Sequence, residues 1–284
     1  MKVYVVPNAQ RPHTIQVAVR AAEILLQYHC SVYMDLSCKQ EIPLENVFFK
    51  KVSECCEQAD VIITIGGDGS ILHSAMVSLP YHKPILGVNV GRCGFLASCE
   101  PNQMEDVLRR VVHSEYQLDS RSLLRVTVVE NGKTEGYYAL NDVIVRNGRV
   151  QHAIDVAISC DDIPVQKYRG DGVIVATPTG STAYSMSAGG PILDAQLNAL
   201  VLTPICPHSL QSSAMVFSAD RRLQISLDSN YPEEVLVTCD GHASFTLHEG
   251  ARVNVTLSDK HIDLISFSKA EQFQAIDKKL RNRD

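Results

Sequence analysis

The residues of this chain best suited to do chemistry lie in one short turn, Gly66-Gly67-Asp68-Gly69-Ser70. The turn directly follows the apolar run Val61–Ile65, which is typical of a buried parallel strand, and the residues after it look helical. Glycines can adopt positive φ and let a ligand approach the backbone closely. A carboxylate between the end of a strand and the start of a helix therefore indicates a phosphate-handling site. The alternative is that Asp68 only caps the helix.

A second stretch with binding character covers residues 170–191 and combines glycines with many hydroxyl groups. Small residues and hydroxyls allow close approach to a flat ring and supply hydrogen-bond donors and acceptors. Asn141 and Asp142 stand inside another apolar segment, where polar side chains are unfavourable unless they are paired. These two residues therefore either bind a ligand or form a β-bulge or a hydrogen bond at a sheet edge.

Composition excludes several classes of function. A net charge of −6 gives no basic footprint, so we expect no nucleic-acid partner. No run of eighteen apolar residues occurs, so no membrane span is expected. The start of the chain looks like a first strand rather than a signal peptide. The nine cysteines contain no Cys-x-x-Cys pair, which favours reduced thiols in a cytoplasmic protein.

The elements that must position these residues alternate in the first part of the chain. Strands are expected at Lys2–Val6, Ser31–Asp35, Val61–Ile65 and Pro84–Val90, and helices at His13–Tyr28, Ser53–Ala59, Ser70–Leu79 and Pro101–Ser114. This alternation predicts a parallel sheet with crossover helices.

After about residue 100 the pattern changes to short strands separated by turn residues, which predicts an all-β sandwich. The expected strands are Leu123–Glu130, Tyr137–Arg146, Ala153–Cys160, Val173–Ala176, Val216–Ser218, Leu223–Leu227, Val235–Thr238, Ala243–His248 and Arg252–Leu257. A further strand at Ile262–Phe267 and a polar helix at Ala270–Arg283 end the chain.

Taken together, Gly66–Ser70, Leu86–Ala97, Leu140–Ile144 and residues 170–191 resemble the NAD kinase family, in the family's order. The Gly-Gly-Asp-Gly element alone is shared with phosphofructokinases and diacylglycerol-type lipid kinases, whereas the 170–191 block is specific. The resemblance implies a Rossmann-like, phosphofructokinase-like α/β domain over residues 1–100, rejoined by the tail 262–284. It also implies a β-sandwich NAD-binding domain over residues 101–261, with the active site in the crevice between the domains.

The implied activity is transfer of the γ-phosphoryl group of ATP to the 2′-hydroxyl of the adenosine ribose of NAD, which gives NADP. Asp68 would be the catalytic base, and Gly66, Gly67 and Gly69 would bind phosphates. The residues that the resemblance implies for NAD binding are Asp68, Gly69, His73, Asn141, Asp142, His152, Arg169, Asp171, Thr182, Ala183, Tyr184, Ser185, Met186, Ser187 and His242.

Several of these roles compete with plainer ones. By resemblance Asp171 faces the nicotinamide carboxamide and Arg169 contacts a substrate phosphate, but the first could be a turn residue and the second a solvated charge. His73 and His152 could be surface histidines. In the run Asp240-Gly241-His242 a histidine replaces the family's glutamine, and Asp240 either positions phosphates or metal or only forms a hairpin turn.

The resemblance further implies a divalent cation, Mg²⁺, that bridges the phosphates of ATP, and assembly as a homodimer or homotetramer. Two other functions remain open on the sequence alone. One is a lipid kinase of the diacylglycerol type, and the other is a dinucleotide sensor without catalytic activity.

Overall fold

The computed structural model describes residues 1–91, 94–148, 153–209, 212–227, 235–241, 243–248, 250–268 and 270–281. The chain forms two compact units, Met1–Ser120 with Ile262–Asp284, and Arg121–His261. The boundary expected near residue 100 thus falls inside the first unit. Strands β6 (Gln117–Glu130) and β17 (Arg252–Ser266) each contribute residues to both units.

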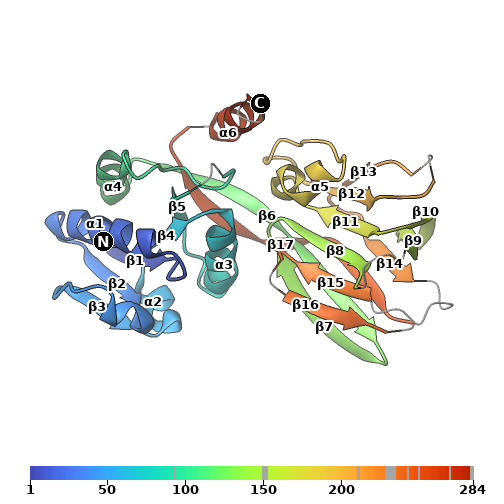
Figure 1. The fold of residues 1–284 in the computed structure, drawn as a ribbon, viewed down its shortest axis with the longest axis horizontal. Coiled ribbons are helices and arrows are strands. Elements are labelled where there is room, and N and C mark those ends of the chain that lie inside the picture. The colour runs from blue at the N-terminus through green and yellow to red at the C-terminus, as the bar shows by residue number, and fades with distance from the viewer. Residues whose placement is uncertain are drawn as a thin grey trace. The chain divides into compact units, whose positions relative to one another are not determined.

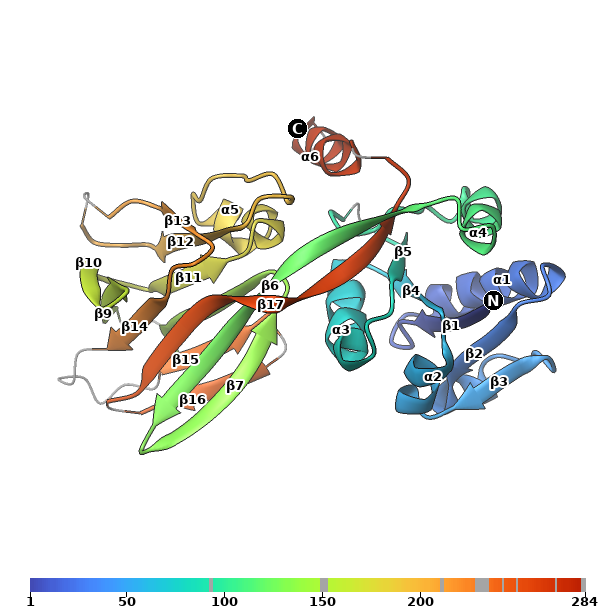
Figure 2. The same cartoon turned by 180° about the vertical axis from the view of Figure 1, so that it is seen from behind.

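The first unit is a parallel sheet with helices between its strands (Figures 1 and 2). Its strands are β1 (Lys2–Pro7), β2 (Ser31–Asp35), β3 (Val47–Lys50), β4 (Val61–Gly66) and β5 (Ile85–Asn89), in the order β17-β5-β4-β1-β2-β3. The helices are α1 (Pro12–Gln27), α2 (Val52–Gln58), α3 (Asp68–Ser78), α4 (Met104–Val112) and α6 (Glu271–Arg281), with short 3₁₀ turns at Leu36–Gln40 and Leu79–Tyr81. The prediction of a parallel α/β domain is confirmed, and the edge strand β3 was not anticipated.

Alternate residues of the strands divide the two faces of this sheet. Val3 and Val5 belong to the core beneath α1 and α4, whereas the buried ring of Tyr4 lies near Cys55 and Cys56 of α2. Because α3 follows β4 directly, the residues between them form a turn at the carboxyl end of a central parallel strand. Ligands of open α/β sheets bind at such strand ends.

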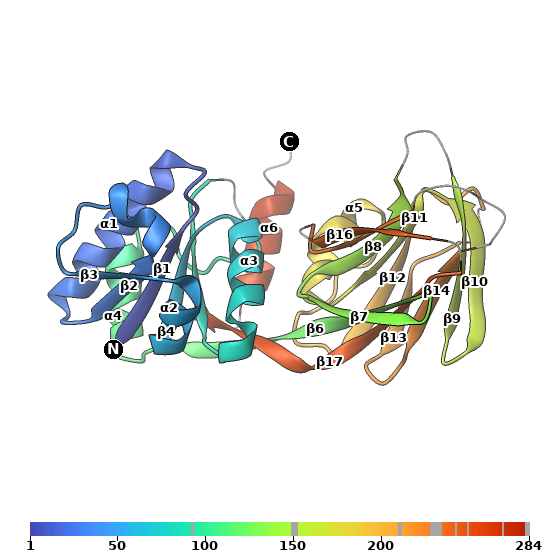
Figure 3. The ribbon, with the colours of Figure 1, turned by 90° about the horizontal axis from the view of Figure 1, so that it is seen from below.

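The second unit contains two antiparallel sheets (Figure 3). One has the order β10-β9-β14-β17, with β6 beside β17 and β7 beside β6; its further strands are β7 (Lys133–Ala139), β9 (Ile154–Cys160), β10 (Ile163–Gly170) and β14 (Leu223–Leu227). The other has the order β13-β12-β11-β8-β15-β16, formed by β8 (Asp142–Asn147), β11 (Gly172–Ala176), β12 (Ala199–Ile205), β13 (Met215–Ser218), β15 (Val235–Cys239) and β16 (Ala243–Leu247). Both sheets contribute side chains to one apolar core, which confirms the predicted β-sandwich.

Two sequence-based assignments of single strands were wrong. The segment Tyr137–Arg146 is not one strand but β7 and β8, with a break at Leu140 and Asn141. Conversely, the strands expected at Arg252–Leu257 and Ile262–Phe267 are continuous as β17, because its polar residue Asp259 points to solvent without interrupting the strand. Strands β10 and β12 were also not predicted.

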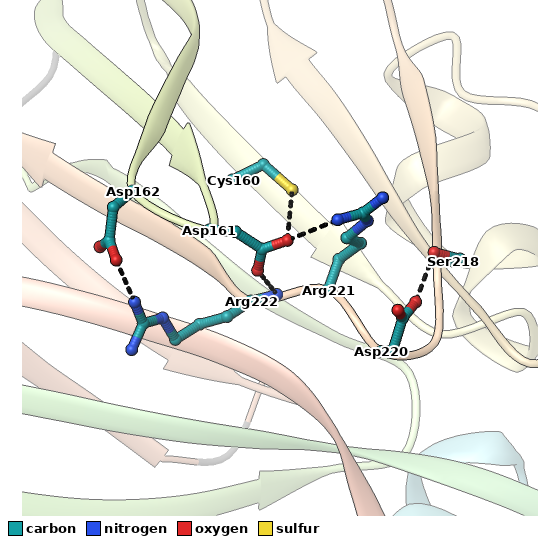
Figure 4. Close-up of polar contacts among 7 residues, drawn as sticks. All are labelled: Cys160, Asp161, Asp162, Ser218, Asp220, Arg221 and Arg222. Atoms are coloured by element: carbon teal, nitrogen blue, oxygen red, sulfur yellow. Dashed lines mark hydrogen bonds and ion pairs between the residues drawn. The ribbon is translucent and has the colours of Figure 1, made fainter.

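The hairpin of β9 and β10 is held at its tip by two ion pairs (Figure 4). Asp161 and Asp162 form the tip with φ values of 50° and 69°. Asp161 lies 2.8 Å from Nη1 of Arg221, and Asp162 lies 2.7 Å from Nη2 of Arg222. The hydrogen bond from Arg221 is the main reason why the pKa of Asp161 is lowered. These exposed pairs add little stability, but they fix one end of a hairpin whose other end carries Arg169.

Within the described ranges, no helix combines the length and the apolar character that a membrane crossing requires.

Candidate functional site

Asp68 is the first residue of α3, and it does not cap that helix. Gly67 occupies the cap position, without a side-chain hydrogen bond to the helix. The carboxylate of Asp68 instead accepts hydrogen bonds from the backbone N–H of Phe95 (2.9 and 3.1 Å) and of Leu96 (3.1 Å). The loop after β5 therefore fixes the orientation of a half-buried carboxylate, and the capping alternative does not hold.

Gly94 is required by this arrangement. A Cβ atom placed on Gly94 would overlap the Oδ1 atom of Asp68. No L-side chain fits between this loop and the carboxylate unless one of them moves. Gly94 therefore contributes to the site because its missing side chain leaves room for the carboxylate of Asp68.

The glycines of the 66–70 turn are needed for space rather than for a special backbone conformation. None of Gly66, Gly67 and Gly69 has positive φ, so the turn does not use the conformation that glycine alone readily adopts. A Cβ on Gly66 would overlap the side chain of Ser70, whereas Gly67 and Gly69 have no atom within 4 Å of such a Cβ. The last two glycines leave open space next to the backbone, as a phosphate-binding turn needs, and their phosphate contacts remain a prediction.

Of the three candidate histidines, the structure describes one. His73 lies one turn after Asp68 on α3 and is exposed. His152 and His242 lie outside the described residues. In the first unit Asp68 and Gly69 thus begin α3, and His73 lies in the middle of that helix.

In the second unit, the turn from Leu140 to Asp142 is closed by a carboxylate from β15's end. The two oxygens of Asp240 accept hydrogen bonds from the backbone N–H of Leu140 (2.6 Å), Asn141 (2.8 Å) and Asp142 (3.1 Å). These bonds explain why the expected strand breaks here, since three successive N–H groups turn toward one side chain. The sequence pointed to Asp240 only as a hairpin residue or a ligand of phosphate or metal; an Asp-Gly pair after a strand was the only signal.

Asp142 carries an unusual charge environment. Its side chain is 4% exposed. Burial, followed by the nearby charge of Asp240, raises the pKa of Asp142 to about 7, although a hydrogen bond from the backbone of Tyr184 opposes the shift. Near neutral pH this carboxyl group can therefore both donate and accept a hydrogen bond, which suits a ligand hydroxyl.

Residues 179–187 form a short 3₁₀ turn (Thr179–Thr182) and the helix α5 (Tyr184–Ser187). The hydroxyl of Thr182 donates to the carbonyl of Thr179 (3.1 Å), and the hydroxyl of Ser185 bonds to that of Thr203 on β12 (2.8 Å). Both side chains are buried and hold the segment in place. The expected adenine-side residues that remain accessible are Ala183, Tyr184, Met186 and Ser187.

Arg169 and Asp171 are exposed where β10 passes into β11. The backbone N–H of Asp171 donates to the carbonyl of Ile205 (3.0 Å). The thiol of Cys206 donates a hydrogen bond to the carboxylate of Asp171, and this bond raises the pKa of Cys206. The side chain of Asp171 therefore has a fixed partner yet stays accessible to a ligand.

The donor set does not suit a metal cage built by the protein. In the part of the chain that the structure describes, no three His, Cys, Asp or Glu side chains are grouped to hold an ion. Mg²⁺ commonly binds through one or two carboxylates together with substrate phosphates. The site therefore fits a cation that arrives with a nucleotide.

Comparisons with known proteins cover both units. Residues 3–116 match the family model described as the ATP-NAD kinase N-terminal domain, and residues 140–267 match the ATP-NAD kinase C-terminal domain. The NAD kinase of Natranaerobius thermophilus is 34% identical over 276 residues, which cover 97% of this chain and 96% of the relative. The NAD kinase of Chlorobium phaeovibrioides is 35% identical over 282 residues, covering 99% and 98%.

Two solved structures share the fold. Yeast NADH kinase complexed with NADH superimposes with a TM-score of 0.92 at 25% identity, covering all of this chain and 88% of the yeast chain. An NAD kinase from Archaeoglobus fulgidus in complex with ATP gives a TM-score of 0.78 at 27% identity and covers 99% of both chains.

Proposed function

The chain belongs to the NAD kinase family, and from this premise we propose that Asp68 is the base of its phosphoryl transfer. The protein is a phosphotransferase that uses ATP to convert NAD to NADP. In the proposed step, Asp68 accepts the proton of the ribose 2′-hydroxyl while that oxygen bonds to the γ-phosphorus. The bond between the γ-phosphorus and the bridging oxygen breaks, and ADP leaves.

The observation that carries this proposal is the way Asp68 is held. Two backbone N–H groups fix its carboxylate, and a carboxylate has about four acceptor positions, so capacity remains for a hydroxyl. Catalysis of phosphoryl transfer rests mainly on positioning and charge, and a base fixed in this way is worth roughly 10²–10⁴ in rate. The open space beside Gly67 and Gly69 is available for the phosphates of the donor.

We assign recognition of NAD to the second unit. Asn141 and Asp142 would bind ribose hydroxyls and adenine, and Tyr184 would contact the adenine ring. Asp171 would read the nicotinamide carboxamide, with Arg169 on a phosphate. His73, His152 and His242 remain candidates by resemblance alone.

Mg²⁺ would be held chiefly by the phosphates of ATP, and it would supply neutralisation of their negative charge. We also propose a homodimer or homotetramer, which is supported by exposed apolar side chains on two edge strands, Ile163 on β10 (67% exposed) and Val216 on β13 (52%). The absence of paired cysteine spacing in the sequence supports a cytoplasmic location.

The test is a phosphorylation assay of the purified protein with NAD and NADH as acceptors, ATP and polyphosphate as donors, and Mg²⁺ present or removed. Asp68→Asn keeps the size of the side chain and removes the base, so kcat should fall about 100-fold or more while NAD affinity changes little. Asp106→Asn, an exposed aspartate of α4 in the same unit, is the matched control. Full activity of Asp68→Asn would overturn the assignment of the base.

A further inference from the structure

The turn that carries Asn141 and Asp142 is held from two sides. Its N–H groups point to Asp240, as described above. Its carbonyl groups point the other way, to Thr177 at the end of β11. The hydroxyl of Thr177 donates to the carbonyl of Leu140 (2.6 Å), and the backbone N–H of Thr177 donates to the carbonyl of Asn141 (2.9 Å).

The same hydroxyl also bonds to the second NAD-binding segment. The backbone N–H of Gly180, in the turn that precedes Thr182 and Tyr184, donates to Oγ1 of Thr177 (3.0 Å). Thr177 is completely buried. One hydroxyl group thus accepts from one of the two segments and donates to the other.

The two segments are also in direct contact. A Cβ atom on Gly180 would overlap the carbonyl oxygen of Asn141. With no space between them, a shift of one turn must displace the other. The hydroxyl of Thr177 sets their relative position, because its single proton goes to the carbonyl of Leu140 while the oxygen accepts from the N–H of Gly180.

We propose that Thr177 is a positioning residue of the kinase reaction, one that acts on NAD only through the two segments it joins. This inference rests on the proposed function, in which Asn141, Asp142 and Tyr184 bind NAD. Loss of the hydroxyl leaves a buried carbonyl and a buried N–H without their partner, which costs free energy. The turn at residues 140–142 and the segment that begins at Gly180 are then no longer held at a fixed distance, and the residues proposed to bind NAD are less well positioned.

The test compares Thr177→Val, which keeps the shape and removes the hydroxyl, with Thr177→Ser, which keeps the hydroxyl. We expect Thr177→Val to raise the KM for NAD about tenfold, a change equivalent to about 1.4 kcal/mol, while the KM for ATP stays the same. Thr177→Ser should restore the KM for NAD. Thr64→Val is the matched control, because Thr64 on β4 is equally buried and its hydroxyl has no hydrogen-bond partner among the described residues.

Two further measurements separate a positioning role from a purely structural one. Calorimetry of NAD binding to Thr177→Val, Asn141→Ala and the double variant gives a mutant cycle, and the losses should be less than additive if Thr177 acts through Asn141. Thermal unfolding of the same variants reports stability. A Thr177→Val protein that loses stability but keeps its KM for NAD within twofold would show that Thr177 only supports the fold.

Failure of this inference differs from failure of the proposed function. If Asn141→Ala leaves NAD affinity unchanged, the turn does not bind NAD. The assignment of Asn141 to NAD binding and the inference about Thr177 are then both wrong. If Asn141→Ala weakens binding while Thr177→Val does not, only the inference falls. Should Thr177→Val not fold, Thr177→Ala, which also removes the hydroxyl, takes its place, and an unchanged KM for NAD in that variant would likewise overturn the inference.

Discussion

The turn at Asp68 and the turn at Asn141 use the same interaction in opposite directions. At Asp68, the carboxylate that we propose as the base accepts hydrogen bonds from the N–H groups of a neighbouring loop. At Asn141, the N–H groups of the turn that we propose to bind NAD donate to the carboxylate of a different residue, Asp240. The first arrangement fixes a side chain, and the second fixes a backbone.

This difference matches what each turn has to do. A base must present one group in one orientation, so its own side chain is anchored. In the turn that we propose to bind NAD, the anchoring bonds from Asp240 go to the main chain, so they use no side-chain group of Asn141 or Asp142. The two turns also differ in burial, since Asp68 is half-buried whereas Asp142 is 4% exposed.

The largest effect should come from removing the space beside Asp68. A Cβ on Gly94 would overlap the carboxylate, so Gly94→Ala must displace Asp68 from the N–H groups that hold it. We expect kcat to fall about 100-fold, close to the effect of Asp68→Asn. Gly136→Ala on β7 is the control, because a Cβ there meets no protein atom within 4 Å and the residue lies outside the proposed site. Equal kcat values in the two variants would show that the anchoring of Asp68 is not needed.

The sequence was sufficient to predict the fold class, but it did not distinguish these two kinds of anchoring. Asp68, Asp171 and Asp240 are each followed by glycine, and only the structure shows that the first is an anchored side chain and the third an anchor. The partners lie far along the chain, since Asp240 bonds to residues about one hundred positions earlier. Local propensity carries no information on such pairings.

The same cause explains the errors in the strands. The break at Leu140 and Asn141 depends on the carboxylate of Asp240, so the polar pair Asn141-Asp142 could suggest an irregularity in the segment but not its cause. In β17, the two ends pair with β14 and with β5, and the polar middle between them continues the strand with Asp259 exposed. Tertiary pairing decided both cases against local pattern.

The second prediction concerns pH and separates the two turns by charge. The pKa of Asp142 is raised from 3.8 to about 7 in the folded protein, by burial first and by Asp240 second. Between these values the folded protein keeps a proton that the unfolded chain has lost, so stability falls as the pH rises from about 4 to about 7. Asp142→Asn has no proton to lose. The free energy of unfolding of this variant should therefore rise relative to that of the wild type, by on the order of 2 kcal/mol between pH 5 and pH 8.

Thermal unfolding between pH 5 and pH 8 measures this difference. Asp161→Asn is the control of opposite sign, because Arg221 lowers the pKa of the exposed Asp161, and its contribution is present above its ordinary pKa and lost as the pH falls. Asp161→Asn should show no gain in stability over the wild type at pH 8. If the gap between Asp142→Asn and the wild type stays constant over the whole pH range, Asp142 does not take up a proton on folding.

The smallest effects should come from the accessible residues of the second unit, which neither anchor a turn nor are anchored by one. Asp171 is exposed, and Tyr184 is 41% exposed. Asp171→Ala should weaken binding of NAD but not of AMP, which has no nicotinamide. Tyr184→Ala should weaken both by about 1 kcal/mol, the lower end of the range for base–aromatic contacts, because the ring is only partly covered.

Cys206→Ala removes the thiol that bonds to Asp171, so it should weaken NAD binding in the same way as Asp171→Ala, with a smaller loss of affinity. Titration of the three variants with NAD and AMP gives six affinities. Equal losses of affinity for NAD and AMP in Asp171→Ala would mean that this carboxylate does not contact the nicotinamide of NAD. The contrast between anchored and accessible residues would then apply only to the residues that bind the adenosine part.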